Sequence, residues 1–267
     1  MLKTRVFNKA TPSNVIFAQR FTALIWVPYL LVDNYNEILF LGRDLFLERG
    51  IYNFLGNNDY LFSFMFWSLF KLVLFLFLFA YIYKLNSNYL FFFLLLIYFY
   101  EMFKKGFGGH IDHRIATLYL FTLILNVSTR DKYENAQIAL LPPVIFFLFQ
   151  YTCIGLARLL NGFPELFIDD IFTRWLVQRS IRPNYFELQF GQVLVENIDS
   201  FYLSSMFFVF TVIELFSIFL LFTERRILQY VLAIHILSHL AIFIFMGVNF
   251  FENILILAML MILDKEK

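Results

Sequence analysis

Four ionisable side chains lie inside apolar runs of this chain: Arg20, Lys71, Arg158 and Glu214. A charge at the centre of a membrane costs about 2.5–3.5 kcal/mol on insertion scales, and such groups usually pair or face a polar cavity. Arg20 and Lys71 lie within about two turns of a predicted helix end, so their side chains can reach the lipid headgroups. Glu214 lies in mid-run, where three explanations stay open: it is protonated, it pairs with Arg20 or Arg158, or it serves as a proton site.

Arg158 stands near the end of the apolar run YTCIGLARLL, residues 151–160. An arginine keeps its charge in proteins. A fixed cation at the end of a span can hold an anion, such as a lipid headgroup, a quinone oxygen or a carboxylate. The alternative is that Arg158 interacts with the helix dipole at the carboxyl end of its own helix, or reaches the headgroups.

The four histidines fall into two close pairs. His110 and His113 lie in GGHIDHR, with Asp112 between them, and His235 and His239 lie one helical turn apart on one face of an apolar run. Neutral imidazole is a common ligand of haem and of transition metals, so these four are the candidate metal ligands. With one cysteine and no dense carboxylate cluster, no metal is expected. Hydrogen-bonded packing and a helix cap at Asp112 are the simpler explanations.

The composition predicts a membrane protein. Of 267 residues, 61% are hydrophobic, whereas soluble domains are usually about 45–50% apolar. A water-soluble globule of this length cannot cover so much apolar surface. The net charge of +1 gives no electrostatic basis for binding nucleic acid. Many Phe, Tyr, Ile, Asn and Lys residues indicate an AT-rich genome, which favours a bacterial inner membrane or an organellar inner membrane.

Apolar runs of about 20 residues are long enough to cross a bilayer as helices. They predict an all-α fold, a polytopic membrane helical bundle of about eight transmembrane helices in a single domain, 1–267. The predicted spans are residues 15–32, 60–83, 88–104, 113–127, 143–160, 201–222, 227–246 and 249–263. The fourth and eighth are short, so they are expected to be tilted, re-entrant or partly interfacial.

The segment 161–199 adds an interfacial amphipathic helix to this prediction. Phe163, Phe167, Ile171 and Trp175 recur at every fourth residue, which places them on one helical face. Such a helix is expected to lie among the lipid headgroups or to pack over the end of the bundle.

The order of several short motifs resembles the HTTM family, the membrane domain shared with vitamin K-dependent gamma-carboxylases. The family motif has a Tyr, a Gly and a Lys-Leu pair, followed by a polar turn and a Trp-containing segment. Further similarities are a histidine before a span, a Ser and an acid after it, and an embedded histidine followed by Gly and Phe. The residues that carry the resemblance are Tyr151, Gly155, Arg158, Leu159, Trp175, His113, Ser128, Asp131, Glu214, His235, His239, Gly247 and Phe250.

The resemblance implies a departure from carboxylase chemistry. In carboxylases of the family, the lysine of the motif is the base tied to vitamin K oxygenation, and this chain has Arg158 there. Arginine does not release a proton at accessible pH. We also expect the chain to lack the large soluble domain that follows the membrane domain in carboxylases. Both departures argue against glutamate carboxylation.

Three functions stay open from the sequence. The first is a non-catalytic or divergent membrane subunit or scaffold, with membrane lipids and other membrane proteins as partners. The second is a membrane enzyme for a quinone or other lipophilic substrate. Arg158, His113 and His235 are its candidate catalytic residues, and Arg158, Tyr151 and Glu214 its candidates for binding a quinone or a lipid. The third is a haem or metal redox protein that uses the histidine pairs.

Overall fold

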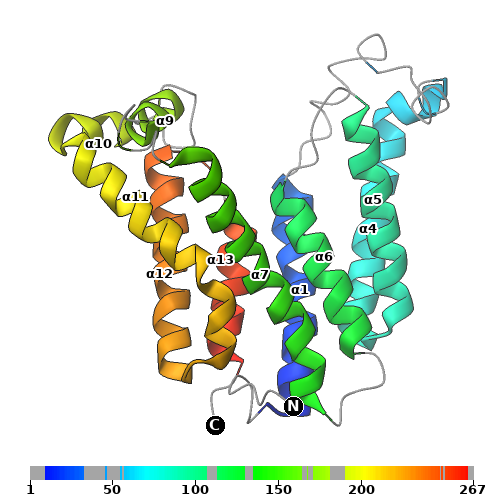
Figure 1. Ribbon diagram of the computed structural model, residues 1–267. Coiled ribbons are helices and arrows are strands. Elements are labelled where there is room, and N and C mark those ends of the chain that lie inside the picture. Colours follow the sequence, from blue (N-terminus) through cyan, green and yellow to red (C-terminus); the bar gives the residue numbers. More distant parts are fainter. Residues whose placement is uncertain are drawn as a thin grey trace. The chain divides into compact units, whose positions relative to one another are not determined.

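Helices and turns make up every described part of the chain in a computed structural model (Figure 1). The described residues are 10–32, 46, 55, 57–106, 113–129, 135–163, 167, 171–180, 190–246, 248 and 250–263. The predicted all-α fold is confirmed for these residues. The chain divides into two compact units, an amino-terminal unit of residues 11–140 and a carboxy-terminal unit of residues 141–267 with 1–10. That residues 1–267 form a single domain stays a prediction.

The helices follow the apolar runs closely. Those of the amino-terminal unit are α1 (Pro12–Val32), the short 3-10 helix η2 (Asp59–Phe62), α4 (Phe64–Lys84), α5 (Ser87–Lys105) and α6 (His113–Thr129). The long helix α7 (Ala136–Gly162) runs from this unit into the next. The carboxy-terminal unit continues with α9 (Ile171–Ser180), α10 (Phe190–Asn197), α11 (Ser200–Leu215), the 3-10 helix η3 (Ser217–Phe222), α12 (Arg225–Met246) and α13 (Phe251–Ile262).

Side-chain caps set several of the helix boundaries. Ser63 accepts a hydrogen bond from the amide of Phe66 at the start of α4, and Asp199 caps α11 in the same way. Between α4 and α5, Leu85 takes a left-handed conformation with φ 51°, and Asn86 then caps α5. A cap satisfies backbone amides that a helix start leaves without an intrahelical partner. These local signals explain why two apolar segments form an antiparallel pair and not one long helix.

Polar contacts join α1 to α6 inside the amino-terminal unit. Gln19 Nε2 donates to Thr129 Oγ1 at 2.6 Å, and Trp26 Nε1 donates to Thr122 Oγ1 at 3.1 Å. All four side chains are buried. Interhelical hydrogen bonds give specificity that apolar side chains cannot, because lipid tails are as apolar as leucine. The two bonds therefore define which face of α1 meets α6.

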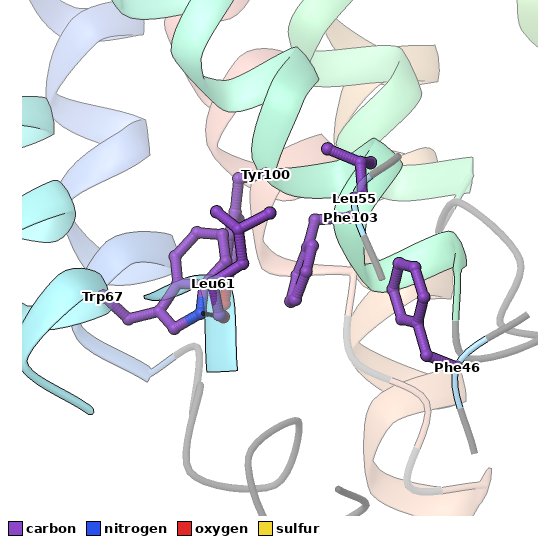
Figure 2. Close-up of a cluster of buried hydrophobic side chains, with 6 residues drawn as sticks. All are labelled: Phe46, Leu55, Leu61, Trp67, Tyr100 and Phe103. Carbon is purple, nitrogen blue, oxygen red and sulfur yellow. Dashed lines mark hydrogen bonds between the residues drawn. The ribbon is translucent and has the colours of Figure 1, made fainter. Parts of the chain in front are cut away.

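An aromatic cluster closes one end of the amino-terminal unit (Figure 2). Its buried members are Phe46, Leu55, Leu61, Trp67, Tyr100 and Phe103. Trp67 Nε1 donates to the carbonyl of Leu61 at 2.6 Å, so the indole packs without a stranded donor. Gly106 follows α5 at a point where an added Cβ would lie 2.2 Å from the Phe46 ring. The cluster thus ties the segment before η2 to the end of α5.

In the carboxy-terminal unit, α7 approaches α11 most closely at Gly155. A Cβ at this position would lie 2.5 Å from the backbone nitrogen of Leu215 and 2.9 Å from the carbonyl oxygen of Thr211. Backbone atoms cannot swing aside as the end of a flexible side chain can. Small residues at helix interfaces are what allow backbones to come so near.

Two short helices pack over one end of the carboxy-terminal unit. In Figure 1, α9 and α10 lie together at the end of α11 and α12, and both contact α12. The four-residue repeat predicted for one helix is not continuous. Phe163 ends the α7 segment, and Phe163 and Phe167 both pack against Phe208 of α11, with ring centroids 5.7 and 5.9 Å away. Trp175 of α9 is 50% exposed. These helices therefore pack on the end of the bundle, and a position among the lipid headgroups stays a prediction.

The count of eight spans is not confirmed. Among the described residues, four helices are long and apolar enough to cross a membrane, at Pro12–Leu31, Phe64–Lys84, Ala136–Gly162 and Arg225–Met246. A fifth span results if α10 and α11, which meet at a bend of 116°, are taken together. Of the other predicted spans, α6 and α13 form shorter apolar helices, and α5 is not among the candidate spans. Hydropathy thus located the helices, and the number of spans beyond these four or five stays a prediction.

We predict that Gly155→Ala destabilises the protein, although alanine favours helix more than glycine does. Its methyl group meets backbone at 2.5 Å, and overpacking of this kind costs about 1–3 kcal/mol. The matched control is Gly162→Ala on the same helix, where a Cβ meets nothing within 4 Å. The measurement is the temperature at which detergent-solubilised protein loses its monodisperse size-exclusion peak. Equal melting of both variants would contradict the close approach.

Candidate functional site

The two charges nearest the α7–α11 contact pair with each other. Arg158 lies one turn beyond Gly155 on α7, and its Nη1 donates to Oε2 of Glu214 on α11. The Glu214 side chain is 1% exposed and that of Arg158 is 29% exposed. Among the alternatives open from the sequence, pairing of Glu214 with Arg158 is therefore the one observed. The positive charge at position 158 is balanced inside the protein.

Aromatic rings hold the guanidinium in place. The Cζ atom of Arg158 lies 5.3 Å from the centroid of the Phe207 ring on α11, within the range of a cation–π contact. Phe172 of α9 stacks on Phe207 with centroids 4.5 Å apart. The arginine, two rings and the carboxylate thus link three helices. We refer to Arg158, Glu214, Phe207 and Phe172 as the arginine clamp.

The position of Arg158 in α7 argues against an interaction with the dipole at the carboxyl end of its own helix. α7 continues to Gly162, and its last turn carries no basic residue. A helix dipole acts mainly within the terminal turn. The ion pair with Glu214, and not an interaction with the helix end, accounts for an arginine at this place.

A second polar cluster involves the histidine pair of α12. The hydroxyl of Tyr151 and Nε2 of His239 are 2.6 Å apart, and Nε2 of His235 lies 3.1 Å from Oγ of Ser217. The Tyr151 and His235 rings are in contact, with centroids 4.6 Å apart. His235 is 0% and His239 is 5% exposed. We call Tyr151, His235, His239 and Ser217 the histidine cluster. It joins α7 and α12 at η3.

The proton on the His235 ring can be assigned from the hydrogen bonds. Ser217 has one hydroxyl proton and donates it to the carbonyl of Ile213 at 3.1 Å. Its oxygen therefore accepts from Nε2–H of His235, which leaves Nδ1 of a neutral His235 as an acceptor. Among the described residues, neither His235 Nδ1 nor His239 Nδ1, both buried, has a hydrogen-bond partner. Buried polar atoms of this kind are uncommon in native proteins and call for an explanation, such as strain, a chemical role or a bound water or ion.

Thr152 positions η3 beneath the histidine cluster. Its Oγ1 accepts from the amide of Ile218 at 3.0 Å and donates to the carbonyl of Leu148 at 3.3 Å. The amide of Ile218 falls where the α11 ladder gives way to the 3-10 helix, so it needs an outside acceptor. Ser217 is held next to His235 as a result. Sequence reasoning missed Thr152 and Ser217, although a serine inside the apolar run LFSIFL was an available signal.

Most of the other candidate residues lie outside the described part of the chain. His113 begins α6 in the amino-terminal unit, but its side chain, like all of His110, Asp112, Asp131 and Gly247, lies outside the described residues. Ser128 bonds locally, donating to the carbonyl of Ala139 at 2.7 Å. Within the described part of the chain, no three His, Cys, Asp or Glu side chains gather where they could hold a metal ion.

One buried carboxylate was not identified from the sequence. Glu101 on α5 is 6% exposed, accepts from the hydroxyl of Tyr29 on α1, and lies 3.3 Å from Nζ of Lys104. The ammonium of Lys104 also lies 5.1 Å from the Tyr100 ring centroid. The sequence does not indicate that Glu101 is buried, because a carboxylate near the end of an apolar run normally reaches water.

Comparisons of the chain with protein-family models, with curated proteins and with solved structures found no match. The resemblance to the HTTM family therefore stays a prediction.

We predict that replacing Arg158 destabilises the protein more than replacing Glu214, although both changes break the same ion pair. Arg158→Met leaves a 1% exposed carboxylate without its counter-charge, and stranding a buried charge typically costs about 3 kcal/mol or more. Glu214→Leu costs less, because the arginine is 29% exposed and can turn outward. The double variant Arg158→Met/Glu214→Leu is expected to melt above Arg158→Met alone. Melting temperatures in detergent give the comparison.

Arg174→Met, which removes an exposed arginine of α9, serves as the control. Additive losses in the double variant would show that the two charges do not depend on each other.

Proposed function

We propose that this chain is a non-catalytic membrane subunit, a scaffold within a larger membrane complex. The observation that carries the proposal is the arginine clamp. Its one cation is already bound to Glu214 and packed on Phe207, so it is committed to holding helices together. Glu101 is engaged with Tyr29 and Lys104 in the same manner. Ionisable groups used for internal packing favour a structural role over turnover.

The same pair supports a divergent place in the HTTM family. An arginine stands where the family's carboxylases have a catalytic lysine, and it cannot act as a base. Its salt bridge to a buried carboxylate strengthens this point, because the positive form is the one that the pair stabilises. We further propose, from the Phe- and Ile-rich composition, that the complex belongs to a bacterial inner membrane or an organellar inner membrane.

Purification from the native membrane in a mild detergent tests the scaffold role. We expect the tagged chain to elute as one discrete species with a protein mass well above its own 32.0 kDa, together with other membrane subunits in fixed stoichiometry. Light scattering gives the mass, and mass spectrometry identifies the subunits. Elution of the chain as a lone, stable polypeptide would reject the role.

A second candidate function, binding of a lipophilic ligand such as a quinone or a lipid, is favoured by the histidine cluster. The unpartnered Nδ1 atoms of His235 and His239 offer polar contacts, and Phe210 and Phe250 pack against the two rings at 5.6 and 5.0 Å. Ligand sites typically combine apolar walls with a few polar groups. This candidate requires a molecule that enters from the membrane.

Organic extraction of the purified protein, followed by mass spectrometry, tests this candidate. We expect one lipophilic compound at close to one equivalent per chain, and less than a tenth of it in His235→Leu. Ser238→Ala is the control, since its hydroxyl bonds to the Ile234 carbonyl of its own helix. An absorbance spectrum of the same sample reports bound haem, the third possibility. A wild-type extract without a stoichiometric compound removes the candidate.

A further inference from the structure

The exposed side of α1 carries an arginine in the middle of a candidate membrane span. The exposed side chains of the helix are apolar on both sides of it, with Phe17 and Leu24 37% and 48% exposed and Leu31 66% exposed. Arg20 lies between them and is exposed as well. Positions 17, 20, 24 and 31 fall on one helical face. The face opposite is buried and holds Gln19, which bonds to α6.

Arg20 lies deeper in its helix than the sequence suggested. The helix begins at Pro12, not at residue 15, and the candidate membrane span extends from Pro12 to Leu31. At 1.5 Å per residue, the Cα of Arg20 is about 12 Å from Pro12 and about 16 Å from Leu31 along the axis. This is close to the middle of a hydrocarbon layer about 30 Å thick. Snorkelling works best for residues near helix ends, so Arg20 is poorly placed for it.

Nothing in the described part of the chain balances this charge. Arg20 makes no hydrogen bond or ion pair there. Of the carboxylates inside described helices, Glu101 and Glu214 are bound to Lys104 and Arg158, and Glu196 accepts a hydrogen bond from Gln192 of its own helix. Glu252 lies in the first turn of α13 and has an interaction of its own.

We propose that the exposed face of α1 binds a transmembrane helix of a second polypeptide, and that this helix places an Asp or Glu carboxylate against Arg20. The inference rests on the proposed role as a subunit. An intramembrane cation requires a counter-charge at its own depth, and guanidinium with carboxylate is the strongest pairing available, with two parallel hydrogen bonds. Phe17 and Leu24 then pack on the apolar residues one turn above and below that carboxylate.

Arg158 shows how the same chain balances another arginine of a candidate span. Arg158 also belongs to a candidate span, and its counter-charge is supplied by a neighbouring helix, α11. Arg20 is the same chemical group in another candidate span, and its side chain is exposed. A partner chain that supplies a carboxylate makes the two sites equivalent.

The first test removes the charge. Arg20→Leu makes α1 more apolar, so insertion and folding are retained, and the isolated chain is expected to melt as the wild type does. The fraction of chain recovered in the large assembly is expected to fall at least tenfold. Arg20→Lys keeps a cation and is expected to retain most of the assembly. Arg226→Leu removes an exposed arginine at the start of α12 and is the control. An intact assembly with Arg20→Leu would overturn the inference.

The second test identifies the molecule that contacts the exposed face of α1. A photoreactive benzoylphenylalanine replaces Leu24 in the native membrane, and Leu72 of α4, 54% exposed, provides the lipid-facing control. A cross-link from position 24 to a transmembrane peptide with an Asp or Glu in its span is expected, and a Lys at that acidic position should restore assembly with Arg20→Glu. Cross-links to phospholipid alone, to a helix without an acid, or within the same chain would overturn the inference.

The two proposals can fail separately. If the wild-type chain is a lone polypeptide, the subunit role fails and the α1 interface fails with it. If the wild type is in an assembly that Arg20→Leu leaves intact, the subunit role stands and the α1 interface alone is wrong.

Discussion

Hydrocarbon offers no hydrogen bonds, and this constraint decides how the helices of the protein pair. A polar side chain on an apolar helix must find its partner on another helix or on its own backbone. Gln19 finds Thr129, Trp26 finds Thr122, and Arg158 finds Glu214. Because a leucine gains little by exchanging lipid for another leucine, these few polar contacts specify which faces meet. The apolar residues then fill the space that the polar pairs define.

Gly155 sets the register in the carboxy-terminal unit. Its missing side chain brings the α7 backbone against Leu215 and Thr211. Residues on the same face of α7 then reach their partners: Thr152 reaches the amide of Ile218, and Arg158 reaches the carboxylate on α11. The arginine clamp and the histidine cluster are thus consequences of one close helix contact. This explains why Thr152, Gly155 and Arg158 lie close together in the sequence although their side chains differ in chemistry.

The charges of the membrane helices serve two different purposes. Arg158 and Glu101 are neutralised inside their own units and stabilise the packing of neighbouring helices. Arg20 lies on an exposed face, where its charge has no use in the packing of its own unit. The histidine cluster differs from both, since its rings are buried and neutral contacts satisfy only one nitrogen of each.

The sequence by itself determined that the chain is helical and apolar, and it located the helices. Hydropathy and capping residues such as Ser63, Asn86 and Asp199 act over a few neighbouring positions, so they can be read from a short window. Only the tertiary structure decided that Arg158 pairs with Glu214, that Ser217 and Thr152 support the histidines, and that Phe163 and Trp175 do not share one helix. Among the described residues, four or five of the eight apolar runs form helices long and apolar enough to span a membrane. The physical reason is that a partner 56 residues away is chosen by which helix backbones approach one another, and that approach depends on packing between elements, which no local pattern records.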